Sequence, residues 1–216
     1  TNPNRLGASS RPDPRPSMST PRQLLSVNTA VTQTMTIQGR PIMTGIGKRS
    51  VSGLDQVRDI VVKPLGLEGD EQADLTVHGG LSKAVYAYPH EHYAFWQTVR
   101  SQAKVQDWNE PLPFGMLGEN LTLTGLLEAD AFIGDQLHFP DCVLAISEPR
   151  QPCYKFEAVM GFKQAAKMMA QSGYCGFYLS VIRPGTIAAG QTYELVPGQR
   201  EVSISELFKT KMRRNG

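Results

Sequence analysis

One loop combines a cysteine, two cations and two prolines, the residue types that can fix and activate a thiol. It is Glu148-Pro149-Arg150-Gln151-Pro152-Cys153-Tyr154-Lys155. The prolines make it stiff and extended, and it directly follows the apolar run 143–147, which is expected to be a buried core strand. Cations such as Arg150 and Lys155 favour the thiolate, the form that attacks or ligates metals. Cys153 is therefore a candidate for chemistry, and the alternative is a small buried hydrophobic residue.

The remaining cysteines and two of the histidines carry weaker signals. Cys142 and Cys175 have apolar or aromatic neighbours and are interpreted as buried. Three cysteines without a secretory signal argue against a disulfide framework, and the absence of a Cys-x-x-Cys pair disfavours a structural zinc site. His90 and His92 are two residues apart, whereas the zinc-protease motif needs a separation of four. They are interpreted as solvated residues at the start of a helix.

Two glycine-rich stretches are candidates for ligand binding. The first runs from Gly66 to Gln72, continues in Val77-His78-Gly79-Gly80 and is followed by Lys83. Its glycines allow positive φ and close backbone approach, and exposed N–H groups in such loops hold anions. Ordinary turn chemistry is the alternative, because neither nucleotide-binding fingerprint is present. The second, 114–121, contains Gly118-Glu119-Asn120, which either points polar groups into a pocket or anchors the loop.

The elements that position these loops are expected to be short strands. Alternating or β-branched runs predict strands at 25–31, 57–62, 84–88, 121–123, 136–139, 143–147, 174–182 and 193–196, and a hairpin that turns at Gln38-Gly39-Arg40. Many short strands at modest spacing favour a closed or nearly closed barrel. The fold class is therefore mostly β (α+β), with a few helices.

Three helices are expected around the strands. Pro89 suits a first helical residue, and the apolar residues that follow, Tyr93, Trp96 and Val99, share one helical face. A second helix is predicted over 157–172, with Gly173 as its C-terminal stop. A third is predicted to begin near residue 203, where Ser203 and Glu206 have the spacing of a capping box.

The first seventeen residues differ from the rest, being rich in Pro, Ser, Asn and Arg. Residues 1–17 are interpreted as an expression-vector leader before a native start at Met18, and the alternative is a disordered arm that binds an acidic surface. Three arginines and one aspartate give this segment a net charge of +2, which equals that of the whole chain. The remainder is near neutral, which disfavours binding of a nucleic-acid polymer. No apolar run reaches the roughly 18–20 residues of a membrane helix, so a cytoplasmic protein without a membrane partner is expected.

Together these motifs resemble the MOSC domain family, the C-terminal domain type of molybdenum-cofactor sulfurases. The resemblance is closest to bacterial YiiM-type proteins, which are linked to resistance against 6-N-hydroxylaminopurine. It covers about residues 25–196 and depends on the order and spacing of the motifs: Gly45-Ile46-Gly47-Lys48, 66–72, 77–80, Tyr88-Pro89, Glu91-His92-Tyr93, 118–121, Ile133-Gly134-Asp135 and 149–155.

The resemblance implies a MOSC-type β-barrel over residues 18–200. Residues 201–216 would be a C-terminal helix or the start of a truncated helical module, since YiiM-type relatives usually continue into a small three-helix domain. Cys153 would be the catalytic residue and the ligand of the molybdenum, because a soft thiolate suits that metal. The cofactor would be bound by Lys48, Gly69, Asp70, His78, Gly79, Gly80, Lys83, Glu119, Asn120, Arg150 and Lys155, with the four cations as candidates for the pterin phosphate.

Three functions remain open from the sequence. The first is a molybdenum-dependent oxidoreductase that reduces N-hydroxylated bases and related small molecules, with electrons from a separate reductase. The second is a sulfur carrier that holds a persulfide on Cys153 for assembly of a metal-sulfur cofactor. The third is a non-catalytic barrel that binds a small molecule. A homodimer is left open.

Overall fold

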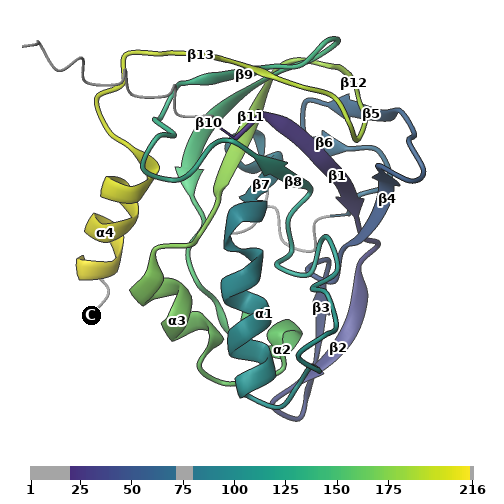
Figure 1. Cartoon of the computed structure of the whole chain (residues 1–216), viewed down its shortest axis with the longest axis vertical. Coiled ribbons are helices and arrows are strands. Elements are labelled where there is room, and N and C mark those ends of the chain that lie inside the picture. The colour runs from purple at the N-terminus through teal and green to yellow at the C-terminus, as the bar shows by residue number, and fades with distance from the viewer. Residues whose placement is uncertain (1–19, 72–79, 215–216) are drawn as a thin grey trace, which may run out of the picture.

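The computed structural model describes residues 20–71 and 80–214 of the chain (Figure 1). Over these residues the strands form an eight-stranded sheet in the order β13-β9-β10-β11-β7-β8-β1-β4, a three-stranded sheet β12-β5-β6 and a hairpin β2-β3. The strands are β1 (Gln23–Thr29), β2 (Gln33–Ile37), β3 (Arg40–Thr44), β4 (Arg49–Gly53), β5 (Ile60–Lys63), β6 (Gly66–Leu67), β7 (Val85–Pro89), β8 (Leu121–Thr124), β9 (Gln136–His138), β10 (Val143–Pro149), β11 (Phe177–Arg183), β12 (Gly185–Ile187) and β13 (Glu194–Val196).

The large sheet curls back on itself. Its strand pairs are antiparallel apart from β7 with β8. The segment that leads into β13 returns to the start of β1: the Leu24 N–H donates to the Gln191 carbonyl at 2.9 Å, and the Gly190 N–H donates to the Leu24 carbonyl at 2.7 Å. These bonds join the β13 side of the sheet to β1, and the mostly β, barrel-like fold predicted from the sequence is confirmed.

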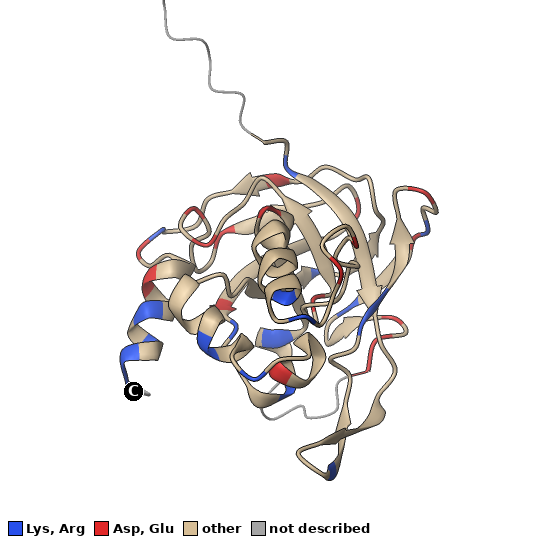
Figure 2. Cartoon of the chain, turned by 60° about the horizontal axis from the view of Figure 1, so that its bottom comes forward, with Lys and Arg blue, Asp and Glu red and all other residues tan. Residues whose placement is uncertain are grey.

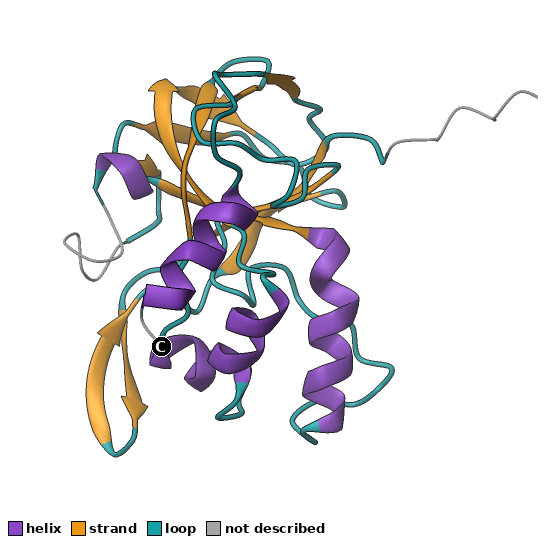
Figure 3. Ribbon diagram, turned by 90° about the vertical axis from the view of Figure 1, so that its left-hand side faces the viewer, coloured by secondary structure: helices purple, strands orange, loops and turns teal. Residues whose placement is uncertain are grey.

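The hairpin was predicted at the correct position. Gln38 and Gly39 both have positive φ, 52° and 76°, and the flanking residues Ile37 and Arg40 pair directly. A two-residue turn with two positive φ angles matches the right-handed twist of the strands that it joins. Figure 3 shows this hairpin extending away from the sheet on the same side as the helices.

The helices are η1 (Leu81–Lys83), η2 (His90–His92), α1 (Tyr93–Gln102), α2 (Tyr154–Met160), α3 (Ala165–Ser172) and α4 (Ile204–Arg214). The α-helices are grouped at one end of the strands (Figure 3). The predicted apolar face of α1 is confirmed, since Tyr93, Trp96 and Val99 are all buried. Trp96 meets Phe156 of α2 edge to face, with ring centroids 5.3 Å apart, so the two helices share one core.

The single helix predicted over 157–172 is wrong. The chain forms two helices there, because Gly161 adopts a left-handed conformation with φ 81° and its N–H donates to the Glu157 carbonyl. This geometry ends a helix, and a second helix then runs to Gly173, which is the predicted C-terminal stop.

The predicted capping box at α4 is confirmed. The Ser203 hydroxyl accepts from the Glu206 N–H at 3.2 Å, and the Glu206 carboxylate accepts from the Ser203 N–H at 2.9 Å. No helix within residues 20–71 and 80–214 is long and apolar enough to cross a membrane. Figure 2 shows acidic and basic residues interspersed along the visible face, with several basic residues on α4.

The prediction that His92 is solvated is wrong. Its side chain is buried, its Nε2 lies 2.8 Å from the Glu128 carboxylate, and its ring stacks on Tyr174 with centroids 3.8 Å apart. Glu128 also accepts the Gly176 N–H at 2.8 Å. This polar contact inside the core ties η2 to the segment before β11.

Candidate functional site

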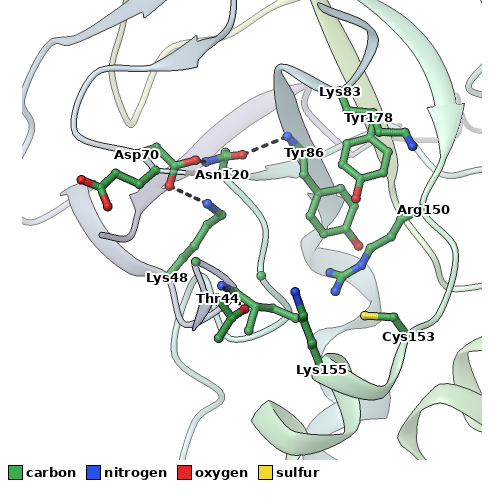
Figure 4. Close-up of a pocket in the computed structure, with 14 residues that line it drawn as sticks. Thr44, Lys48, Asp70, Lys83, Tyr86, Asn120, Arg150, Cys153, Lys155 and Tyr178 are labelled. Atoms are coloured by element: carbon green, nitrogen blue, oxygen red, sulfur yellow. Dashed lines mark hydrogen bonds and ion pairs between the residues drawn. The ribbon is translucent and has the colours of Figure 1, made fainter. Parts of the chain in front are cut away.

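A pocket lies where β7, β10 and β11 meet the loops after β3 and β6 (Figure 4). It contains about 600 Å³ of empty space, part of which is open to solvent. The described residues that line it are Thr44, Gly45, Ile46, Lys48, Asp70, Glu71, Lys83, Tyr86, Gly118, Asn120, Arg150, Cys153, Lys155 and Tyr178.

Cys153 lies at the wall of this pocket. The proline-rich loop leaves the buried strand β10 and presents Cys153 in an extended conformation, with φ −143° and ψ 162°, immediately before α2. The side chain is half-buried against the core and makes no capping bond to the helix. The loop therefore fixes the position of the thiol, and the thiol does not cap the helix that follows.

The other two cysteines are fully buried, as predicted. Burial raises the pKa of Cys142 to about 11 and that of Cys175 well above its ordinary value. A thiol in such a setting is protonated and inert at neutral pH. Cys153 is thus the thiol that the pocket offers among the described residues.

Arg150 is fixed behind Cys153 by stacking. Its guanidinium lies over the rings of Tyr86 and Phe156, 4.8 Å and 5.3 Å from their centroids, and its Nη1 donates to the Leu117 carbonyl. The arginine is buried, yet its Nε has no hydrogen-bond partner. A buried donor without an acceptor is costly, so this position favours a ligand that offers one.

Gly118 lets the neighbouring loop approach Arg150. Its φ is 85°, and a Cβ added here would lie 3.2 Å from the Arg150 Nη1 and 2.9 Å from the Ile46 Cγ1. Only glycine combines this conformation with the available space. The glycine in this motif therefore shapes the wall of the pocket.

A buried polar cluster forms the opposite side of the pocket (Figure 4). The Lys48 Nζ lies 2.5 Å from Asp70 Oδ1, and Asp70 Oδ2 accepts from the Asn120 amide at 2.8 Å. The Asp70 carboxylate also accepts the Ala30 N–H, and Asn120 accepts the Tyr86 N–H at 3.0 Å. Backbone and side-chain bonds thus fix the positions of the lysine and its carboxylate.

The remaining cations differ in how they are held. The Lys83 Nζ is 3.9 Å from Glu148 Oε1 and 5.8 Å from the centroid of the Tyr178 ring. Glu148 also pairs with Lys211 of α4 at 3.2 Å. Lys155 extends from α2 at the mouth of the pocket and has no ion pair within residues 20–71 and 80–214.

Glu119 lies behind the pocket and does not line it. Its fully buried carboxylate accepts the Tyr93 hydroxyl, the backbone N–H groups of Gly115 and Leu117, both at 3.1 Å, and the Thr122 hydroxyl at 2.9 Å. Burial raises its pKa, and the hydrogen bonds oppose that rise. In this structure Glu119 anchors the loop that carries Gly118.

The pocket brings together most of the residues that the sequence singled out. Those that line it are Lys48, Asp70, Lys83, Asn120, Arg150, Cys153 and Lys155. Gly69 and Gly80, with φ 79° and 88°, do not line the pocket: Gly69 directly precedes Asp70, and Gly80 is the N-cap of η1, which ends at Lys83. The predicted positions His78 and Gly79 lie outside the described residues.

Tyr86 and Tyr178 are lining residues that sequence reasoning did not single out. They pair directly across β7 and β11, and their ring centroids are 5.3 Å apart. Each was included in a predicted strand, but the pairing of strands 92 residues apart in the sequence gives no local signal. Thr44, at the end of the hairpin, was missed for the same reason.

Comparison with known sequences identifies relatives over most of the chain. The MOSC domain matches residues 74–194, more than half of the chain. The uncharacterized protein YflK of Bacillus subtilis is 38% identical over 182 residues, covering 84% of this chain and 76% of that protein. Protein YiiM of Escherichia coli is 34% identical over 169 residues, covering 78% and 70%. A reductase of Gibberella moniliformis is 34% identical over 136 residues, which are 61% of this chain and 22% of that protein.

Solved structures agree with the sequence comparison. The crystal structure of YiiM from Geobacillus stearothermophilus superposes with a TM-score of 0.68 at 29% identity, covering 90% of this chain and 85% of that one. YiiM from Escherichia coli gives a TM-score of 0.65 at 28% identity, covering 89% and 78%. From this fold, the pocket around Cys153 and the matched domain, we conclude that the chain belongs to the MOSC domain family.

Proposed function

We propose that the pocket binds a molybdenum cofactor with the Cys153 thiolate as a metal ligand, and that the protein reduces N-hydroxylated bases and related compounds to amines. The observation that carries the proposal is the position of Cys153, a thiol at the wall of a cation-lined pocket in a MOSC domain. The related Gibberella moniliformis protein, 22% of which is covered by the match, is described as a reductase, which supports a place for this type of domain in proteins that carry out redox chemistry.

The residues present fit such a cofactor. Within residues 20–71 and 80–214, no three His, Cys, Asp or Glu side chains gather into a metal-holding group. Cys153 thus offers one soft ligand, which suits a metal whose other ligands include the sulfur atoms of the pterin. Arg150 lines the same pocket with an unpartnered buried Nε, a donor suited to an anionic group such as a pterin phosphate.

When bound, the cofactor would supply a metal centre that exchanges two electrons with the substrate. The chain itself would hold and orient the reactants. Arg150 and Lys155 would bind anionic groups from the same side as Cys153, and the rings of Tyr86 and Tyr178 would form a wall that excludes water. Electrons would come from a separate reductase.

The test compares cofactor-loaded wild type with Cys153→Ala and, as a matched control, Cys142→Ala. With reduced methyl viologen as electron donor and 6-N-hydroxylaminopurine as substrate, wild type and Cys142→Ala should form the amine, and Cys153→Ala should not. Molybdenum measured per chain should follow the same order.

Two results would contradict the proposal. Equal molybdenum content and equal turnover in Cys153→Ala would show that the thiol is not a ligand. A molybdenum-loaded wild type that reduces no hydroxylamine or amidoxime would refute the reductase. The sulfur carrier would instead be supported if the protein shows no turnover and mass spectrometry finds a sulfur adduct on Cys153 after exposure to a cysteine desulfurase.

A further inference from the structure

We infer that Lys48 is the proton donor of this pocket, held in position by Asp70 and Asn120 on the side opposite Cys153. The inference depends on the reductase activity proposed above and assigns a role within that site. It differs from the expectation that Lys48 binds the cofactor phosphate as a point charge.

The proposed reaction needs protons at the substrate. Reduction of a hydroxylamine breaks the N–O bond and forms an N–H and an O–H bond: R–NH–OH + 2 e⁻ + 2 H⁺ gives R–NH₂ + H₂O. The electrons come from the external reductase, and the substrate nitrogen is reduced. The leaving oxygen departs as water only if it is protonated. A positioned acid therefore lowers the barrier, and such acids typically raise the rate by about 10²- to 10⁴-fold.

Lys48 has the geometry of such an acid. Its side chain lines the pocket and is 8% exposed, and its Nζ lies 2.5 Å from Asp70, whose side chain is 1% exposed. Asp70 is fixed in turn by the Ala30 N–H and by Asn120. Figure 4 shows Lys48 and Asp70 across the pocket from Cys153 and Arg150, so a substrate between the two sides would meet the amine on the face away from the thiol.

The electrostatic setting of Lys48 is that of an acid able to release its proton. Burial has the largest effect and lowers the pKa of Lys48, and Arg150 lowers it further. Asp70 and, more weakly, Glu119 raise it. The net pKa is below the ordinary lysine value. Among the described residues, the other charged or titratable groups that line the pocket are Glu71, Lys83, Lys155, Cys153, Tyr86 and Tyr178. An amine whose pKa lies below its ordinary value transfers its proton more readily.

The neighbouring groups are less suited to this task. A guanidinium does not deprotonate in proteins, which excludes Arg150. The Glu71 carboxylate is bound by the N–H and hydroxyl of Thr32. Glu119 lies behind the wall and accepts four bonds there. Lys48 combines burial, a fixed position and a place on the pocket wall.

The decisive variant is Lys48→Arg. It keeps the positive charge and a partner for Asp70 but cannot release a proton. Lys48→Met serves beside it as an uncharged variant of similar length, in case the larger arginine disturbs the fold, which melting temperature reports. Lys63→Arg is the matched control, because Lys63 forms an exposed pair with Glu68 at 3.0 Å away from the pocket.

A donor role predicts that Lys48→Arg and Lys48→Met bind molybdenum as wild type does and lose about 100-fold or more in kcat, while Lys63→Arg keeps wild-type kcat. Wild-type turnover by Lys48→Arg would overturn the inference, as would loss of molybdenum from Lys48→Met, because both results indicate a charge that binds the cofactor. If loaded wild type is itself inactive, the reductase proposal fails and the donor role fails with it.

A second experiment compares the titration of Lys48 itself with the pH dependence of turnover. The Lys48 Nζ is followed by ¹⁵N NMR during a pH titration of wild type and Asp70→Asn. Because the Asp70 carboxylate raises the pKa of Lys48, its removal should lower that pKa, and in loaded enzyme the alkaline limb of kcat should move to lower pH. If Asp70→Asn lowers the pKa of Lys48 but leaves the alkaline limb of kcat at the same pH, Lys48 is excluded as the acid.

Discussion

Replacing Glu119 with alanine removes the acceptor of four buried donors at once. The Tyr93 hydroxyl, the Gly115 and Leu117 N–H groups and the Thr122 hydroxyl all donate to this carboxylate. Each donor left unsatisfied costs about 1–3 kcal/mol, and water that enters the vacated space recovers part of the sum. We expect a loss of about 3–5 kcal/mol in the free energy of unfolding, a large share of the roughly 5–15 kcal/mol typical of a domain.

Glu119→Gln separates the charge from the hydrogen bonds. The amide keeps one acceptor oxygen but turns an N–H₂ toward at least one donor, which should cost about 1–2 kcal/mol at neutral pH. Burial raises the pKa of Glu119 in the folded state, so the folded protein binds this proton more tightly than the unfolded chain. Wild-type stability from this group therefore falls as pH rises above about 4.5, and the cost of Glu119→Gln should be larger at low pH than at high pH.

Urea unfolding measures both effects, followed by circular dichroism and by tryptophan fluorescence, to which the buried Trp96 contributes. Glu68→Ala is the control, since Glu68 lies in an exposed ion pair, and it should change stability by less than about 0.5 kcal/mol. If Glu119→Ala costs less than about 1 kcal/mol, the carboxylate does not anchor the loop, and the explanation of how Gly118 reaches Arg150 is refuted.

Three further predictions test the fold and the thiols. Gly118→Ala should destabilise the protein by about 1–3 kcal/mol, because the new Cβ would lie 2.9 Å from Ile46 at a positive φ; an unchanged melting temperature would contradict the close approach. Ser203→Ala should cost about 1 kcal/mol by removing the capping box of α4, and a loss below about 0.3 kcal/mol in urea unfolding would show that the cap contributes little. Alkylation of the native protein at pH 8 should modify Cys153 before Cys142 and Cys175, because burial raises the pKa of both core thiols; peptide mass spectrometry that finds Cys142 labelled first would refute this order.

The sequence correctly predicted those features that depend on one or two residues close together in the chain. The hairpin depends on Gly39, the capping box on Ser203 and Glu206, and the end of α3 on Gly173, and all were predicted correctly. The helix predicted over 157–172 was wrong because a glycine inside a helical pattern is tolerated in many helices. At Gly161 the left-handed conformation divides the helix instead.

The candidate site was predictable only in part, because its geometry depends on distant pairings. The cations and the thiol were visible as motifs, but the pairing of Tyr86 with Tyr178 follows from strand register. Glu119 and Asn120 are adjacent in the sequence and were expected to share a role. The structure separates them: the Asn120 side chain reaches Asp70 at the pocket, and the Glu119 side chain turns into the loop behind it.

Ligation of molybdenum by Cys153 is the central claim, and X-ray absorption at the molybdenum edge tests it most directly. Loaded wild type and Cys153→Ser are compared, with Cys142→Ala as the control for a thiol in the core. The proposal predicts one sulfur neighbour fewer at the metal in Cys153→Ser than in wild type, and no change in Cys142→Ala. An equal number of sulfur neighbours in wild type and Cys153→Ser would contradict it.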